Sequence, residues 1–380
     1  MTSYPLPDCM THPDGAARFA FVTFLMLNDS YLPGALLLAY ALRRQKTRAD
    51  LVCLITPEIT PAARQALAQL YSRVIEVERL FVPRKRRQER QDLPFVFTRI
   101  HALRLGADGD LGCRYDKLVL LDADVLPLRH YDHLFTLDTP AGIVNESRAA
   151  VMEYDAEGRY ILPASVAVDG TWKWHRLYEG VCPHGRPIPA ALTDRVRTDP
   201  TNMGINSSLF VLTPSMAEFA AIQENVRRPE VVELVSDQFH WPEMQYLTLR
   251  WSGQWTSVDL RFSGFSGYPD MQTLFGSHYA GIKPWAFKKR EALAHWGRHA
   301  DFQYWFQEYT AMLRDYPRLQ DAPRLARLLR QIEELQAELH PPLVKTRGRG
   351  GEGARGRKGE GERGRRGDKV TRRPGDRRQR

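Results

Sequence analysis

Lys117-Leu-Val-Leu-Leu-Asp122-Ala-Asp124-Val-Leu-Pro-Leu is the stretch of sequence that decides the fold. Its apolar residues predict a buried strand, and two aspartates separated by one small residue follow directly. In extended backbone, residues i and i+2 point to the same side, so both carboxylates converge at the end of the strand. Ligands of open α/β sheets bind at this carboxyl edge. Hard carboxylate oxygens at this spacing suit Mn²⁺ or Mg²⁺, so Asp122 and Asp124 are candidate metal ligands beside a diphosphate.

The sequence around the stretch predicts an α/β fold. Apolar runs of strand length alternate with helical segments that begin at Ser30 and at Thr60-Pro61. Such alternation is typical of a parallel sheet covered by helices. We expect strands over 19–27, 50–56, 74–77, 117–121 and 209–212, and helices over 30–44, 60–71, 98–105, 215–225 and 301–339.

Several classes of protein are excluded or disfavoured. The 380 residues are 43% hydrophobic, which is enough for a large core and rules out a wholly disordered protein. The four cysteines form no Cys-x-x-Cys pair, so a zinc site made only of cysteine is disfavoured. No Gly-x-x-x-x-Gly-Lys-Ser/Thr motif is present, which excludes a P-loop NTPase. A nicotinamide-dependent dehydrogenase is disfavoured because the first turn, 28–31, has no glycine. We expect a cytoplasmic protein, since no apolar run is long enough to span a bilayer and no signal-peptide pattern is present.

The basic character of the chain is confined to its C-terminal part. Residues 345–380 contain 15 Lys and Arg against 5 Asp and Glu, whereas the whole chain carries only +9. The glycine period in this part slips and only one proline is present, so a disordered tail is favoured over a collagen-like one. We expect an irregular lead-in over 1–18, a main domain over 19–300, a helical segment over 301–343 and a disordered Arg/Gly tail over 344–380. Apolar residues at heptad spacing in 325–339 favour packing onto the domain, with a homodimer seam as the alternative.

Six motifs, taken together and in order, resemble the family 8 glycosyltransferases, which are glycogenin-like retaining enzymes with a GT-A fold. The resemblance runs over residues 19–285. The motifs are Asn28-Asp29-Ser-Tyr31 with Gly34-Ala35-Leu, Leu54-Ile-Thr-Pro57, Phe97-Thr-Arg99-Ile-His101, Leu121-Asp122-Ala-Asp124, Ile205-Asn206-Ser207-Ser208-Leu-Phe-Val-Leu-Thr-Pro214, and His278-Tyr-Ala-Gly281-Ile-Lys283-Pro-Trp285. It implies a GT-A domain with a mostly parallel central sheet.

The resemblance also implies the site residues. His278 is the third metal ligand beside Asp122 and Asp124, and imidazole favours Mn²⁺ over Mg²⁺. Lys283, a catalytic residue in this interpretation, places a charge on the departing diphosphate. The other implied donor-binding residues are Asn28 and Tyr31 at the uracil, Arg99, Ala123 at the ribose, Asn206 and Ser207 at the sugar, and Gly281 beside Lys283.

The sequence departs from the family at an acidic pair near the donor sugar. The family has Asp-Gln there, whereas this chain has Glu243-Met-Gln245. Glu243 and Gln245 are therefore the candidate catalytic pair, and the sequence leaves open which of the two fills the site. Asp237-Gln238 matches the letters but lies six residues earlier.

The function we expect from this resemblance is metal-dependent transfer of a hexose from a UDP-sugar, most simply UDP-glucose, to an unidentified acceptor. The alternative is an RNA- or polyanion-binding protein with a vestigial glycosyltransferase domain, because Arg-rich disordered tails bind phosphate backbones without sequence preference. In either case the tail is expected to bind polyanions weakly.

Overall fold

The computed structural model describes residues 4–85, 91–146, 167–168, 171–172, 178–266 and 271–340. Residues 1–341 form one compact unit. The basic tail, over which disorder was predicted, lies outside the described residues. So does most of the segment between Glu146 and Tyr178. Among the described residues, no helix combines the length and the apolar character that crossing a membrane requires.

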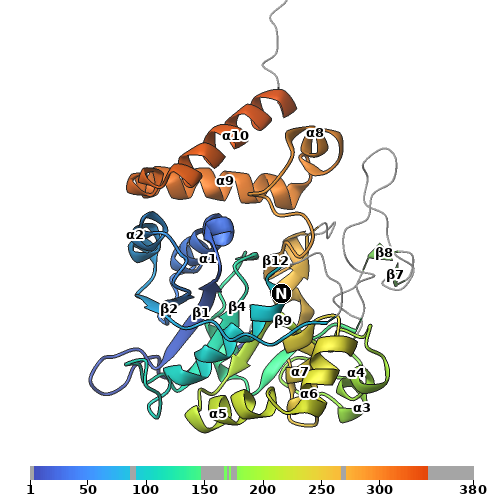
Figure 1. Ribbon diagram of the computed structural model, residues 1–380. Coiled ribbons are helices and arrows are strands. Elements are labelled where there is room, and N and C mark those ends of the chain that lie inside the picture. Colours follow the sequence, from blue (N-terminus) through green and yellow to red (C-terminus); the bar gives the residue numbers. More distant parts are fainter. Residues whose placement is uncertain are drawn as a thin grey trace, which may run out of the picture. The chain divides into compact units, whose positions relative to one another are not determined.

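A seven-stranded sheet forms the centre of the compact unit (Figure 1). Its strands stand in the order β10-β6-β9-β4-β1-β2-β3, and only β9 runs against the others. Their bounds are β1 Phe19–Leu25, β2 Asp50–Ile55, β3 Arg73–Glu76, β4 Lys117–Leu121, β6 Ala141–Val144, β9 Ile205–Leu212 and β10 Thr256–Ser257. The central strands are apolar on both faces, as a sheet covered on both sides requires. The mostly parallel α/β sheet predicted from the sequence is confirmed.

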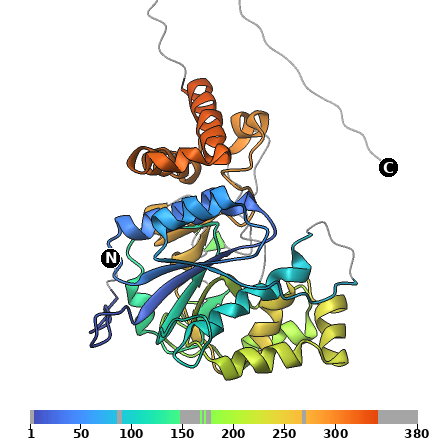
Figure 2. The same cartoon turned by 60° about the vertical axis from the view of Figure 1, so that its left-hand side comes forward.

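Two apolar layers cover the sheet. On one face lie α1 (Leu32–Arg44), α2 (Pro61–Leu70), α9 (Ala300–Asp315) and α10 (Pro323–Leu339), which share one core with β1 and β4. On the other face lie η2 (Leu93–Leu105), α5 (Met216–Asn225) and α7 (Pro242–Arg250). Figure 2 shows α1, in blue, stretched across the sheet beneath the C-terminal helices.

A small second sheet, β11-β12-β5, completes the site edge of the domain. Its strands are β11 Gly264–Phe265, β12 Gly276–His278 and β5 Val125–Pro127. The shorter elements are η1 Asp29–Tyr31, η3 Asp132–Thr136, β7 Ala167–Val168, β8 Thr171–Trp172, α3 Ala190–Thr193, α4 Arg195–Thr198, α6 Pro229–Glu233, η6 Leu234–Gln238, η7 Leu260–Ser263, η8 Met271–Thr273, α8 Lys289–Glu291, η9 Ala292–Trp296 and η10 Pro317–Asp321.

The C-terminal helices pack onto the domain. The apolar positions of α10 are at most 3% exposed within the single chain, and the core that buries them also contains α1 and α9. These positions are Leu325, Leu328, Ile332, Leu335 and Leu339. The heptad spacing is therefore accounted for by packing within the chain. The helical segment expected over 301–339 is interrupted by η10, which separates α9 from α10.

Candidate functional site

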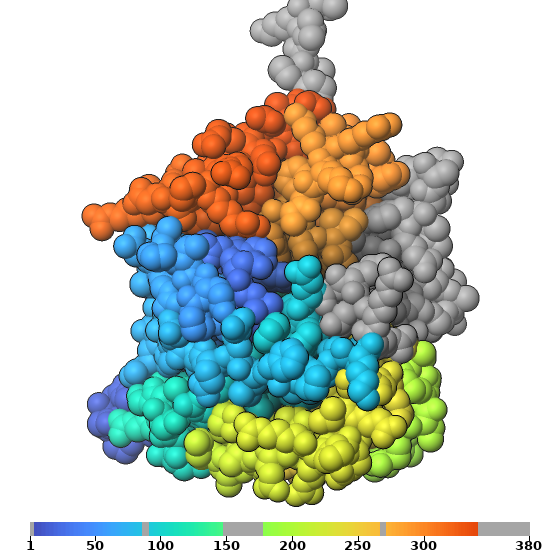
Figure 3. All heavy atoms as spheres, viewed as in Figure 1, coloured from blue at the N-terminus to red at the C-terminus, as the bar shows by residue number. Residues whose placement is uncertain are grey.

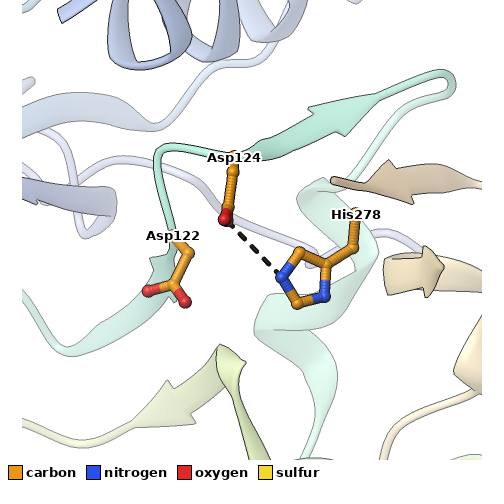
Figure 4. Close-up of side chains that lie close together, drawn as sticks. All are labelled: Asp122, Asp124 and His278. Carbon is orange, nitrogen blue, oxygen red and sulfur yellow. Dashed lines mark ion pairs between the residues drawn. The ribbon is translucent and has the colours of Figure 1, made fainter. Parts of the chain in front are cut away.

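The fold brings Asp122, Asp124 and His278 together at the carboxyl end of β4 (Figure 4). Asp122 follows the last residue of β4, and Asp124 precedes β5. Antiparallel pairing of β5 with β12 sets His278 opposite Val125, and the Tyr279 N–H donates to the Asp124 carbonyl over 2.9 Å. One ligand atom from each of the three side chains lies within 4.8 Å of the others. The arrangement offers two carboxylates and an imidazole to one point.

This set of side chains fits a divalent ion. Asp124 and His278 are 7% and 6% exposed. The Oδ1 atom of Asp124 and the Nδ1 atom of His278 are buried and have no hydrogen-bond partner among the described residues, although Oδ1 forms an ion pair of 3.5 Å with His278 Nε2. Buried polar atoms are normally hydrogen-bonded, so a buried carboxylate oxygen that accepts no hydrogen bond at the edge where ligands bind fits a role as a cation ligand. Carboxylate oxygens suit both Mn²⁺ and Mg²⁺, and the imidazole is the ligand that favours Mn²⁺ of the two.

Lys283 lies against the same carboxylate. Its ammonium group donates to an Asp124 carboxylate oxygen and to the carbonyls of Tyr279 and Ala280. Burial raises the pKa of the Asp124 carboxyl, but Lys283 and His278 outweigh it and hold the pKa well below its usual range. The ammonium nitrogen also lies 5.8 Å from the ring centroid of Tyr31. Lys283 therefore links the candidate metal ligands to the first turn of the fold.

Arg99 is the buried centre of the other half of the site. Its guanidinium donates to Asp122 and, over 2.8 Å, to the Ser207 carbonyl, and it lies 3.2 Å from the Glu243 carboxylate. Burial is the largest effect on Asp122 and raises the pKa of its carboxyl, although Arg99 opposes it. Arg99 and Glu243 are both at most 6% exposed. One cation thus holds two carboxylates from different elements.

A β-bulge shapes the strand that carries Asn206 and Ser207. The register between β6 and β9 shifts at Gly142 and Ile143, which pair with Phe210 and Asn206 respectively. Bulges redirect backbone groups beside functional sites. Here the bulged residues present the Ser207 carbonyl to Arg99, while the Asn206 side chain accepts from the Ser208 N–H over 2.9 Å.

The turn after β1 is held in an uncommon conformation. Leu27 has φ of 69°, a left-handed value that is rare for a non-glycine residue, and its N–H donates to Thr56 Oγ1 over 2.9 Å. Asn28 caps η1 by accepting from the Ser30 N–H, and the Asp29 carboxylate accepts from both the N–H and the hydroxyl of Thr60. The turn therefore presents Asn28 and Tyr31 at the site edge, both exposed.

The structure separates the two members of the candidate catalytic pair. Glu243 lies at the site, where it forms an ion pair with Arg99. Gln245 is fully buried away from it: its amide oxygen accepts from the Trp241 N–H, and its amide nitrogen donates to the carbonyls of Pro200 and Asn202. Residues two positions apart on a helix point in nearly opposite directions, and this explains the split.

The remaining candidates divide between the site and other places. Ala123 lies buried between the two aspartates, and Gly281 lies in an exposed turn before Lys283. Asp237, of the alternative Asp-Gln pair, lies in η6 and pairs with Lys85 instead.

The chain contains a second Asp-x-Asp sequence, Asp108-Gly-Asp110, which makes structural contacts away from the candidate site. Asp110 pairs with Arg104, and Asp108 accepts from the Met216 N–H at the start of α5.

Sequence reasoning missed the structural part played by Trp285. Its ring lies 5.5 Å from that of Tyr31, and it packs where a side chain on Gly34 would otherwise stand. The Lys-Pro-Trp context was visible in the sequence, but Tyr31 and Gly34, which Trp285 packs against, come from a distant part of the chain.

Comparison with known proteins identifies a family domain in this chain. The model of Glycosyl transferase family 8 matches residues 22–170. Uncharacterized protein R707 of Acanthamoeba polyphaga mimivirus is 26% identical over 65% of this chain and 72% of its own length. Galactinol synthase 1 of Ajuga reptans is 25% identical over 73% of this chain and 76% of its own length.

Similarity to the glycogenins is higher but shorter. Glycogenin of Neurospora crassa is 39% identical over 117 residues, which are 30% of this chain and only 16% of that protein. Among solved structures, galactosyltransferase LgtC in complex with donor and acceptor sugar analogs aligns with 75% of this chain and 94% of its own, at 16% identity and a TM-score of 0.41.

Proposed function

We propose that this chain, whose residues 22–170 match Glycosyl transferase family 8, is a glycogenin-like member of that family and transfers a hexose from a UDP-sugar to an acceptor in a Mn²⁺-dependent reaction. Family membership supports a transferase that retains the configuration of the sugar. The observation that carries the proposal is the convergence of Asp122, Asp124 and His278 at the carboxyl end of β4. UDP-glucose is the donor we propose to test first.

The residues have separate roles in this proposal. Asp122, Asp124 and His278 would hold the ion, and a bound ion would supply positive charge beside the donor diphosphate. Lys283 adds a second positive charge where the diphosphate leaves, as the bond between the anomeric carbon and the phosphate oxygen breaks. Glu243, oriented by Arg99, faces the sugar, while Gln245 fixes the start of α7. Asn28 and Tyr31 contact the base, and Asn206, Ser207 and Gly281 complete the donor site, with Ala123 beneath the ribose.

The test is release of UDP from a panel of UDP-sugars with and without Mn²⁺. We expect turnover that requires the metal with at least one sugar. Asp124→Asn should abolish turnover and weaken UDP binding, because the ion loses a charged ligand. Asp110→Asn is the matched control, since it removes an exposed aspartate of the other Asp-x-Asp motif and should leave turnover unchanged. No turnover with any sugar by a folded protein would overturn the donor assignment.

A second candidate function is polyanion binding, which the charge of residues 345–380 favours. Arg-rich segments release counterions from phosphate backbones, so their binding weakens steeply with salt. A chain ending at Leu343 should keep any transferase activity and lose salt-sensitive retention on heparin. If the activity disappears with the tail, the tail belongs to the enzyme and is not a separate binding module.

A further inference from the structure

A series of aromatic rings connects the turn after β1 with the C-terminal helices. Tyr31 meets Trp285 edge to face, with 5.5 Å between the ring centroids. Trp285 in turn lies 5.8 Å from Trp305 of α9, and Trp305 stacks on Tyr309 at 5.0 Å and 11°. Aromatic pairs at these separations attract each other beyond simple burial. The series starts at the residue proposed to contact the base and ends inside the C-terminal helices.

Trp285 is wedged tightly in the middle of this series. It is 6% exposed, and a Cβ built on Gly34 of α1 would lie 2.7 Å from its ring. The same Cβ would collide with the carbonyl oxygen of Ala123, between the two candidate metal-binding aspartates. The Trp285 ring therefore packs directly against α1, and a displacement of Trp305 would move both the Trp285 ring and α1.

Hydrogen bonds make a second, independent connection. Arg324, in the first turn of α10, donates to the Ser30 carbonyl in the turn after β1 over 3.2 Å. The Tyr309 hydroxyl donates to the Leu325 carbonyl over 3.1 Å and so joins the aromatic series to the same end of α10. Figures 1 and 3 show the C-terminal helices, in orange and red, resting on the blue N-terminal helices.

We propose that α9 and α10 form part of the nucleotide-base site by holding the turn at residues 28–31 in its binding conformation. Trp305 and Arg324 are then positioning residues, which act through Trp285 and Ser30 and touch no reacting atom. The turn is short, its end is exposed, and it leaves β1 through a residue in the left-handed region. Ordering such a turn before binding reduces the entropy lost when the base binds. The inference rests on the proposed function, because it takes the base to bind at Asn28 and Tyr31.

The experiment compares two variants with two matched controls in the full chain. Arg324→Gln and Trp305→Leu remove the two connections. Arg327→Gln removes another exposed arginine of α10, and Trp296→Leu removes a tryptophan that is equally buried beside Phe302 and Phe306 but is outside the series. The measurements are the affinity for UDP with Mn²⁺, the KM and kcat for the donor, and the exchange rate of the Ser30 amide, which donates to Asn28.

We expect Arg324→Gln and Trp305→Leu to weaken UDP binding and raise the donor KM about 5- to 10-fold with kcat nearly unchanged, the pattern of lost uniform binding. The Ser30 amide should exchange faster in both, while each control stays within about twofold of the wild type. Wild-type affinity and exchange in Arg324→Gln, a surface change that leaves the core intact, would overturn the inference. If the wild type binds no UDP, the proposed function fails, and unchanged Ser30 exchange would separately show that the helices do not hold the turn.

Discussion

At the scale of single residues, Arg99 compensates two carboxylates that the fold buries together. Replacing one partner of a buried ion pair leaves uncompensated charge, so Arg99→Gln should lower the free energy of unfolding by about 3 kcal/mol. Part of the loss should return with Mn²⁺, because the ion also compensates Asp122. Urea titration with and without Mn²⁺ measures both effects. Arg114→Gln, which breaks an exposed pair with Asp14, should cost less than about 1 kcal/mol, and equal losses in the two variants would contradict the prediction.

Two histidines that are not candidate metal ligands should make stability depend on pH. Burial lowers the pKa of His133 and of His184 to about 4, whereas an unfolded histidine titrates near about 6.5. Between these values the unfolded chain binds more protons, so the free energy of unfolding should rise as the pH increases from 4 to 6.5. His184→Asn removes one of the two titrating groups, so the slope of stability against pH should be smaller. The fold should be kept, because the amide oxygen can still accept from the Asp259 N–H as His184 Nδ1 does. Urea midpoints at several pH values test this, and equal slopes would refute it.

At the scale of elements, α1 depends on a glycine. Alanine at Gly34 would gain about 1 kcal/mol of helix propensity. It would also press a Cβ against the Ala123 carbonyl and the Trp285 ring, and overpacking costs about 1–3 kcal/mol. Because the obstacle is backbone, which cannot rotate away, we expect Gly34→Ala to destabilise the protein and to lower turnover by moving Asp122 and Asp124.

Gly180→Ala is the control for this substitution, because no atom of the described residues lies within 4 Å of a Cβ there. Thermal unfolding and initial rates of both variants give the answer. A more stable Gly34→Ala protein would mean that the helix propensity outweighs the contact.

Features set by residues close together in the sequence could be predicted, whereas features set by tertiary packing could not. Apolar runs predicted five of the seven strands of the main sheet but missed β6 and β10, which are only four and two residues long. The Asp-x-Asp end of β4 indicated the edge of the candidate site. By contrast, η2 forms a 3₁₀ run from Leu93, five residues before the helix predicted there, because no period in the sequence distinguishes the two helix types. The choice between Glu243 and Gln245 required the direction of α7, which tertiary packing sets. Tyr31 and Ser30, which Trp285 and Arg324 contact, come from a segment hundreds of residues away.

At the scale of the whole molecule, the extent of the shared core predicts where the chain can be shortened. Helices α9 and α10 contribute Phe302, Trp305 and Leu325, each at most 1% exposed, to the same core as α1, whereas the compact unit ends at Pro341. A chain ending at Pro341 should therefore unfold in one transition at the wild-type midpoint. A chain ending at Arg298 would expose that core and, at about 1.5–3 kcal/mol for each large apolar side chain no longer buried, should not fold. Circular dichroism and calorimetry of the two chains test this prediction. A stably folded chain ending at Arg298 would show that the domain with the donor site folds without the C-terminal helices.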